Sequence, residues 1–88
     1  MEVKILREEK DNIVLEIDNQ TVAEILRVYL NEDDAVTMAA WKREHPDKPV
    51  LFELKTKGKS AKKAFEDAAA AVEKETEKIL DDFKKAAK

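Results

Sequence analysis

Two segments near the start of the chain, residues 2–8 and 13–17, have the apolar and polar positions of β-strands. The second segment shows the alternation most clearly, because its odd-numbered positions are all aliphatic. A period of two is typical of strands that bury one face, and the polar residues 10–12 suit the turn between them. We therefore expect the chain to open with a β-hairpin.

The pattern becomes helical at Thr21. Thr21 and Glu24 match a capping box, in which the Thr hydroxyl accepts from the Glu24 amide and the Glu carboxylate reaches back to the Thr21 amide. The apolar residues that follow recur at spacings of three and four: Val22, Ile25, Leu26, Tyr29 and Leu30. The acidic residues 32–34 end this pattern, so a helix of about two to three turns is predicted from Thr21.

Residues 35–43 and 50–56 are two further predicted strands, the second with larger apolar side chains on alternate positions. The connection 44–49 contains both prolines of the chain. Proline cannot donate a hydrogen bond to a central strand, so this connection is a loop or lies at a sheet edge.

Residues 60–88 form the longest regular pattern. Ser60 can cap a helix, and neither Gly nor Pro occurs between it and Lys88. Such a helix has about 28 residues and is roughly 42 Å long. Its apolar residues recur at spacings of four and three: Phe65, Ala69, Val72, Thr76, Ile79 and Phe83, with Leu80 beside them.

The predicted order is β-β-α-β-β-α within one domain, residues 1–88, which defines an α+β fold. The connections within each strand pair are too short for a parallel crossover, so both pairs are expected to be antiparallel.

The long predicted helix is the element that points to a partner. Strands of five to seven residues span about 17 to 24 Å, so a helix of roughly 42 Å extends past the sheet by several turns. Leaving its apolar residues in water loses about 1.5 to 3 kcal/mol for each side chain that could be buried. The alternative is that the helix crosses the sheet diagonally and that these residues are ordinary core; periodicity does not separate the two.

Composition excludes several classes of protein. The chain is 42% charged and 43% hydrophobic and has no cysteine, so it is expected to fold without disulfides or a thiolate zinc site. It has neither an apolar run long enough to span a bilayer nor a signal peptide, so we expect no membrane partner and a cytoplasmic location. The net charge of -3 does not suit an autonomous nucleic-acid binder.

Candidate chemistry is sparse, and we expect no catalytic residue, metal site, cofactor or small-molecule substrate. His45 is the single histidine and lies in a polar loop, whereas acid–base and metal sites need several convergent groups. The acidic run 32–34 lacks the spaced ligands of a calcium loop and is better explained as a solvated helix end. Trp41, the single tryptophan, is expected on the same face as Ala39, either open to a partner or partly covered at the end of the sheet.

The whole chain resembles archaeal RNA polymerase subunit L, a family of small, α-like dimerisation subunits. The matching segments are Met1 to Leu6 with Leu15 to Asp18, Thr21 with Ile25-Leu26, Val36 to Trp41 followed by His45-Pro46, and Leu54 to Gly58 before the last helix. The family's acidic-His-Thr sequence at the first helix is here Asp18-Asn19-Gln20-Thr21, so only the Thr matches.

The resemblance implies a four-stranded antiparallel sheet with both helices on one face and a long C-terminal helix. It also implies a non-catalytic assembly subunit that forms a heterodimer, through its helices, with the larger, D-type subunit of RNA polymerase. That heterodimer would be a platform for the largest catalytic subunits, with no direct nucleic-acid contact. The residues expected at the dimer interface are Leu26, Tyr29, Leu30, Phe65, Val72, Ile79, Leu80 and Phe83. Trp41 is a candidate contact to a large subunit.

Two rival hypotheses come from other classes of protein. A free-standing nucleic-acid-binding module would use Trp41 and the lysines of residues 57–63, although the first 56 residues have 8 basic and 13 acidic side chains. An enzyme would need a polar pocket around His45, without a cysteine or a glycine-rich phosphate loop to assist it.

Overall fold

A computed structural model describes residues 2–73 and 79–86 of the chain. Its elements are β1 (Val3–Glu9), β2 (Asn12–Ile17), α1 (Gln20–Leu30), β3 (Val36–Lys42), β4 (Val50–Thr56), α2 (Ala61–Ala71) and α4 (Ile79–Ala86). The four strands and the first helix begin and end within a few residues of the predicted bounds, and α2 begins where the second helix was predicted. The α+β class is therefore confirmed.

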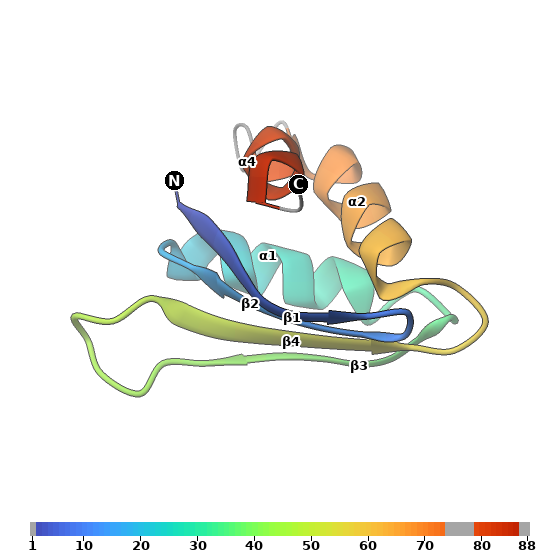
Figure 1. Cartoon of the computed structure of the whole chain (residues 1–88), viewed down its shortest axis with the longest axis horizontal. Coiled ribbons are helices and arrows are strands. Elements are labelled where there is room, and N and C mark those ends of the chain that lie inside the picture. Colours follow the sequence, from blue (N-terminus) through green and yellow to red (C-terminus); the bar gives the residue numbers. More distant parts are fainter. Residues whose placement is uncertain (1, 74–78, 87–88) are drawn as a thin grey trace.

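The strands form one four-stranded sheet in the order β1-β2-β4-β3, and every neighbouring pair is antiparallel. The two hairpins meet along β2 and β4, where Ile17 pairs with Val50 and Ile13 with Leu54. Figure 1 shows α1, α2 and α4 on one side of this sheet and leaves the other side bare. This arrangement confirms the antiparallel sheet with its helices on one face.

The core lies between the sheet and the helices. Alternate side chains of β2 and β4 point toward the helices and are fully buried, which explains the period of two in the sequence. The largest of the fully buried side chains come from both layers: Phe52, Phe65, Phe83, Ile13, Leu15, Ile17, Leu26, Leu30, Leu54, Ile79 and Val50. The short chain thus builds a continuous apolar interior without any disulfide.

The first helix begins at a different cap from the predicted one. The side-chain oxygen of Asn19, not that of Thr21, accepts from the backbone N–H of Val22 at 3.1 Å. Asn is as good an N-cap as Thr, and Glu24 is engaged elsewhere, so the predicted capping box does not form. At the second helix the prediction is confirmed, since Ser60 Oγ accepts from the Lys63 amide at 3.1 Å.

The prediction of a single long C-terminal helix is wrong for the described residues. α2 ends at Ala71, and α4 is a separate helix that packs against both α2 and β1. The rings of Phe65 and Phe83 stack with centroids 4.4 Å apart, whereas 18 residues of continuous helix would separate them by about 27 Å. Residues 74–78 and 87–88 of the predicted helix, Thr76 among them, lie outside the described residues.

The chain folds back after α2 because this buries apolar side chains of α4. Folding back places Ile79 and Phe83 on the chain's own core, where both are 0% exposed. The longest extent of the Cα atoms is 35 Å, less than the roughly 42 Å of a straight helix. Of the apolar residues expected to project beyond the sheet, Ile79 and Phe83 are therefore covered by the chain itself, and Leu80 is partly buried.

No helix among the described residues is long and apolar enough to cross a membrane.

Candidate protein interface

The structure separates the eight predicted interface residues into two groups. Five are fully or almost fully buried inside the chain, namely Leu26, Leu30, Phe65, Ile79 and Phe83. Val72 is 4% exposed, Leu80 is partly buried against the core, and Tyr29 is 43% exposed. In this conformation a partner can contact Tyr29, Leu80 and the small exposed part of Val72. The five buried residues belong to the core beneath this surface.

An apolar groove lies along the outer face of α1. Its lining consists of Ile25, Val28 and Tyr29 from α1 and Val72 from the end of α2, with Glu24 and Glu32 at its borders. The groove is an open hollow of ≈ 360 Å³. Val28 is 48% exposed, so it and Tyr29 are two of the three large hydrophobic side chains that face solvent in the described part of the chain.

The sequence prediction missed the part played by Val28. The buried stripe of α1 runs through Val22, Leu26 and Leu30, and these residues explain the amphipathic pattern. Ile25, Val28 and Tyr29 form a second stripe, three and four residues apart, on the adjacent face. The apolar arc of α1 is wider than one stripe facing the core. This width, visible in the sequence, is the signal that could have revealed the surface.

A carboxylate at the start of the groove is held by two elements. Glu24 accepts two hydrogen bonds from the Arg27 guanidinium, at 2.8 and 2.6 Å, and one from Trp41 Nε1 at 2.9 Å. The hydrogen bonds from Arg27, and then that from Trp41, lower the pKa of Glu24 from 4.5 to about 2. The ionised Glu24 therefore ties α1 to β3 and fixes one border of the groove.

The turn that follows α1 is joined to α2 by a cluster of ion pairs. Lys59 Nζ lies 3.1 Å from Asp33 Oδ2 and 3.0 Å from Asp67 Oδ2, and Lys63 Nζ lies 3.3 Å from Asp67 Oδ1. A hydrogen bond from the Ala35 amide, followed by that from Lys59, lowers the pKa of Asp33. The hydrogen bond from Lys59 is the main cause that lowers the pKa of Asp67. This Lys59 cluster joins the turn after α1 to α2.

Trp41 lies on the helix-covered face of the sheet. It shares that face with Ala39, as predicted, and pairs with Phe52 in the adjacent strand. An open-face position is wrong, because Trp41 is packed against the core and donates to Glu24 of α1. The alternative, a partly covered residue near the end of the sheet, is confirmed; contact with a large subunit stays a prediction.

The structure does not assemble a nucleic-acid site from the predicted residues. Trp41 pairs with Phe52, five positions before Lys57, which corresponds to about 17 Å along a strand. Lys59 and Lys63 are engaged by the carboxylates of Asp33 and Asp67. The aromatic ring and the lysines therefore do not form one basic surface.

No group of side chains suited to a metal ion occurs among residues 2–73 and 79–86. His45 is exposed in the loop between β3 and β4. A cleft of ≈ 510 Å³ near that loop is lined by Pro46 and Pro49, but His45 is not part of its lining. This cleft therefore does not supply the polar pocket around His45 that the enzyme hypothesis would need.

These features define a class: a small α+β module with a self-contained core and an exposed apolar groove suited to another protein. A family model described as the RNA polymerase Rpb3/Rpb11 dimerisation domain matches residues 11–82. The chain belongs to this family. As membership of a dimerisation-domain family implies, it is not itself an enzyme.

Two relatives agree with this membership, and a solved structure has the same fold. The DNA-directed RNA polymerase subunit Rpo11 of Pyrococcus horikoshii is 33% identical over 95 residues, which cover 100% of this chain and 99% of that protein. Its counterpart in Methanothrix thermoacetophila is 30% identical over 90 residues and covers 98% of each chain. The structure of DNA-directed RNA polymerase subunit L from Thermoplasma acidophilum has the same fold, with a TM-score of 0.71, 22% identity, and coverage of 94% of this chain and 85% of that one.

Proposed function

We propose that this chain is subunit L of an archaeal RNA polymerase and that it forms a heterodimer with the larger, D-type subunit. Together the two subunits are the platform on which the largest catalytic subunits assemble. The proposal is supported by membership of a dimerisation-domain family across residues 11–82 and by relatives that bear the name of a polymerase subunit. A cytoplasmic location belongs to the same proposal.

The observation that carries the proposal is the exposed groove on α1. Val28 and Tyr29 are 48% and 43% exposed, although each is large and apolar enough to be worth burying. Protein interfaces are built around such side chains at a dry centre, with polar groups at the rim. The D-type subunit is therefore assigned to the groove, with Tyr29 as its aromatic anchor.

The carboxylates at the borders of the groove favour some charges on the partner over others. Glu24 is neutralised locally by Arg27, whereas Glu32 has no ion pair among the residues that the structure describes. An exposed carboxylate beside an apolar groove favours a basic or hydrogen-bond-donating group on the partner and disfavours an acidic one. The apolar centre supplies affinity, and Glu32 contributes to orientation.

The test is the mass of the complex in solution. Light scattering on the purified chain alone, on the D-type subunit of the same polymerase alone and on their mixture is expected to give one 1:1 heterodimer in the mixture. A chain whose mass is unchanged by the D-type subunit would contradict the proposal. A matched variant, Val28→Asp, is expected to remain folded by circular dichroism and to form less of the heterodimer at the same concentrations.

A further inference from the structure

The face of the sheet turned away from the helices has its own pattern of side chains. Strand register places them in rows across the sheet, since residues opposite each other in an antiparallel pair share a face. One row is Lys4, Glu16, Leu51 and Lys42; a second is Arg7, Val14, Glu53 and Ala40; a third contains Asn12, Lys55 and Met38, with Glu9 at its end. We call this surface the open face.

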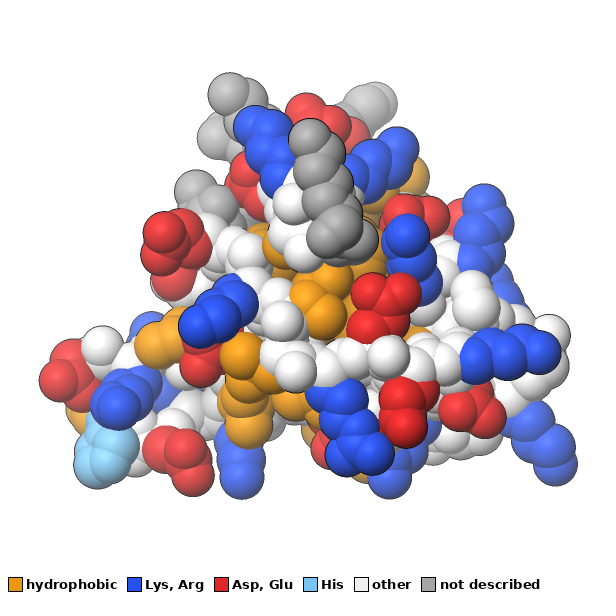
Figure 2. Space-filling view, viewed as in Figure 1, with side chains coloured by type: hydrophobic (Ala, Val, Ile, Leu, Met, Phe, Trp, Pro, Cys, Tyr) orange, Lys and Arg blue, Asp and Glu red, His pale blue; other side chains and the backbone are white. Residues whose placement is uncertain are grey.

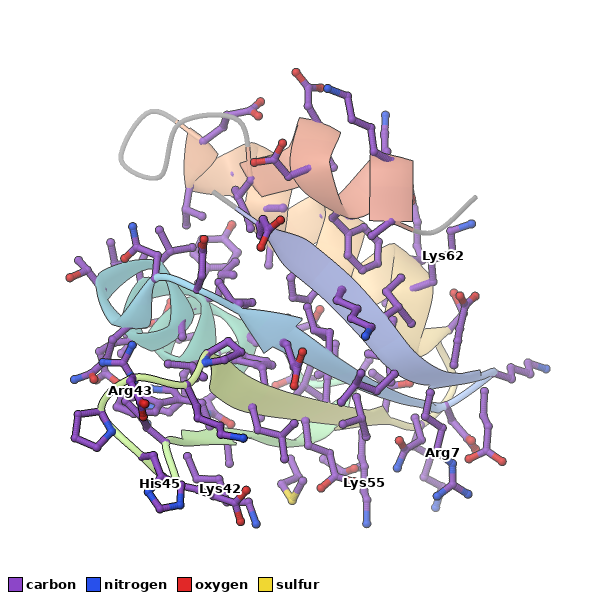
Figure 3. The ribbon with its side chains drawn as sticks, turned by 60° about the vertical axis from the view of Figure 1, so that its left-hand side comes forward. Arg7, Lys42, Arg43, His45, Lys55 and Lys62 are labelled. Atoms are coloured by element: carbon purple, nitrogen blue, oxygen red, sulfur yellow. The ribbon has the colours of Figure 1, made fainter. Side chains whose placement is uncertain are left out.

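Basic and acidic groups differ in position on the open face. The basic residues Lys4, Arg7, Lys42 and Lys55 are exposed, and the side chains of Arg7 and Lys42 are each 66% accessible. Figure 3 shows Arg7, Lys42 and Lys55 below the sheet, on the side opposite α2 and its Lys62. In Figure 2 blue side chains recur along the same lower border, with acidic ones among them.

The acidic groups are less available. Glu16 and Glu53 lie on the inner strands and are half-buried, and Glu53 Oε2 accepts from Asn12 Nδ2 at 3.2 Å. Glu9 is paired with Arg7 at 3.2 Å. Lys42 Nζ lies 4.0 Å from the exposed Glu44 Oε2. By contrast, Lys4 and Lys55 have no ion pair within residues 2–73 and 79–86. In these rows the exposed charged side chains without an ion pair among the described residues are therefore both basic, Lys4 and Lys55.

The centre of the open face is apolar and slightly hollow. Val14, Ala40 and Leu51 line a shallow depression of ≈ 210 Å³ between Lys42 and Glu53. An apolar centre with charges at its margin is the arrangement of a protein interface. A nucleic-acid backbone is disfavoured, because its phosphates would lie over the carboxylates of Glu16 and Glu53.

We infer that the open face binds a second protein, one whose surface presents Asp and Glu side chains around an apolar patch, while the groove on α1 holds the dimer partner. The occupant is another subunit of the polymerase, so the inference rests on the proposed function. The chain then joins two neighbours through opposite sides of one thin sheet. Charge complementarity sets the orientation of the second neighbour and its sensitivity to salt.

Lysine footprinting on the purified polymerase that contains this chain tests the inference. Acetylation rates of Lys42 and Lys55 are compared in the free chain, in the heterodimer with the D-type subunit and in the whole polymerase, with Lys62 as a reference. Both rates are expected to fall by about fivefold or more only in the whole polymerase. Equal rates in the heterodimer and the polymerase would overturn the inference, as would protection that disappears after nuclease digestion.

Two double variants with reversed charges provide a second test of the inference. The double variant Lys42→Glu/Lys55→Glu is compared with Lys62→Glu/Lys84→Glu, which changes two lysines on α2 and α4. The open-face variant is expected to bind the D-type subunit normally but to enter the polymerase about tenfold less well. Equal incorporation of the two variants overturns the inference alone, whereas failure of the unaltered chain to bind the D-type subunit would overturn the proposed function.

Discussion

Two apolar regions on the helix side of this protein have opposite fates. The residues around Phe83 at the C-terminal end are buried, with Phe83 itself 0% exposed, because α4 folds onto β1 and α2. Val28 and Tyr29 on α1 are 48% and 43% exposed. Both regions have the spacing of an amphipathic helix, so spacing does not decide which of them meets a partner.

The two regions differ in whether the chain itself can cover them. α4 can return to the chain's own core, and each large apolar side chain that it buries contributes about 1.5 to 3 kcal/mol. The outer face of α1 points away from the sheet that its inner face covers, so no described element lies over Val28. We therefore expect the partner at the apolar face that the chain cannot bury by itself.

The largest expected effect is loss of stability at the buried region. Phe83→Ala removes a fully buried ring that stacks on Phe65 and is expected to lower the free energy of unfolding by about 3 to 5 kcal/mol. Tyr29→Ala, the matched change on the exposed region, is expected to cost about 1 kcal/mol or less. Urea denaturation measures both. A Phe83→Ala loss no greater than that of Tyr29→Ala would mean that α4 is not packed on the core.

A smaller effect on stability is expected at acidic pH, from Glu24 at the border of the groove. Its pKa is about 2 in the folded chain and 4.5 ordinarily, so the folded state favours the ionised form. The stabilisation is therefore complete above pH 4.5 and is lost as the pH falls from 4.5 toward 2. Glu24→Gln should flatten the pH dependence of thermal unfolding in that range. Glu32→Gln is the control, and equal curves for the two variants would contradict the assignment.

The smallest effect is expected at the Lys59 cluster. Lys59→Met keeps the length of the side chain but removes the cation between Asp33 and Asp67. Exposed ion pairs contribute about 0 to 1 kcal/mol, so the loss of stability should be about 1 kcal/mol or less and should shrink with added salt. NMR titration should show the pKa of both carboxyl groups rising. Lys63→Met is expected to affect Asp67 alone; a rise at Asp33 with that variant would contradict the contacts.

The sheet and the positions of its core side chains could be predicted from the sequence. Alternation in β2 and β4 names residues such as Leu15 and Phe52 that are fully buried in the structure. Short connections made antiparallel hairpins the favoured choice, and both formed. These features depend on local geometry, which a periodic pattern records directly.

The errors concern choices between two local options that only tertiary contacts can settle. Asn19 and Thr21 are both good caps, and Glu24, which the capping box at Thr21 needs, is engaged by Arg27 and Trp41. The alternation correctly placed Trp41 with Ala39 but did not say which face the helices cover. The absence of Gly and Pro after Ser60 suggested one straight helix, because it records helix propensity and not the burial available to Phe83.

The most direct test of the central claim, that the groove on α1 holds the dimer partner, is the Kd for the D-type subunit by titration calorimetry. Val28→Asp places a charge in the groove, whereas Leu6→Asp changes a side chain of similar exposure, 46%, on β1. We expect Val28→Asp to weaken binding by about 30-fold or more, or about 2 kcal/mol, and Leu6→Asp to change it by less than about twofold. Equal Kd values for the two variants would contradict the claim.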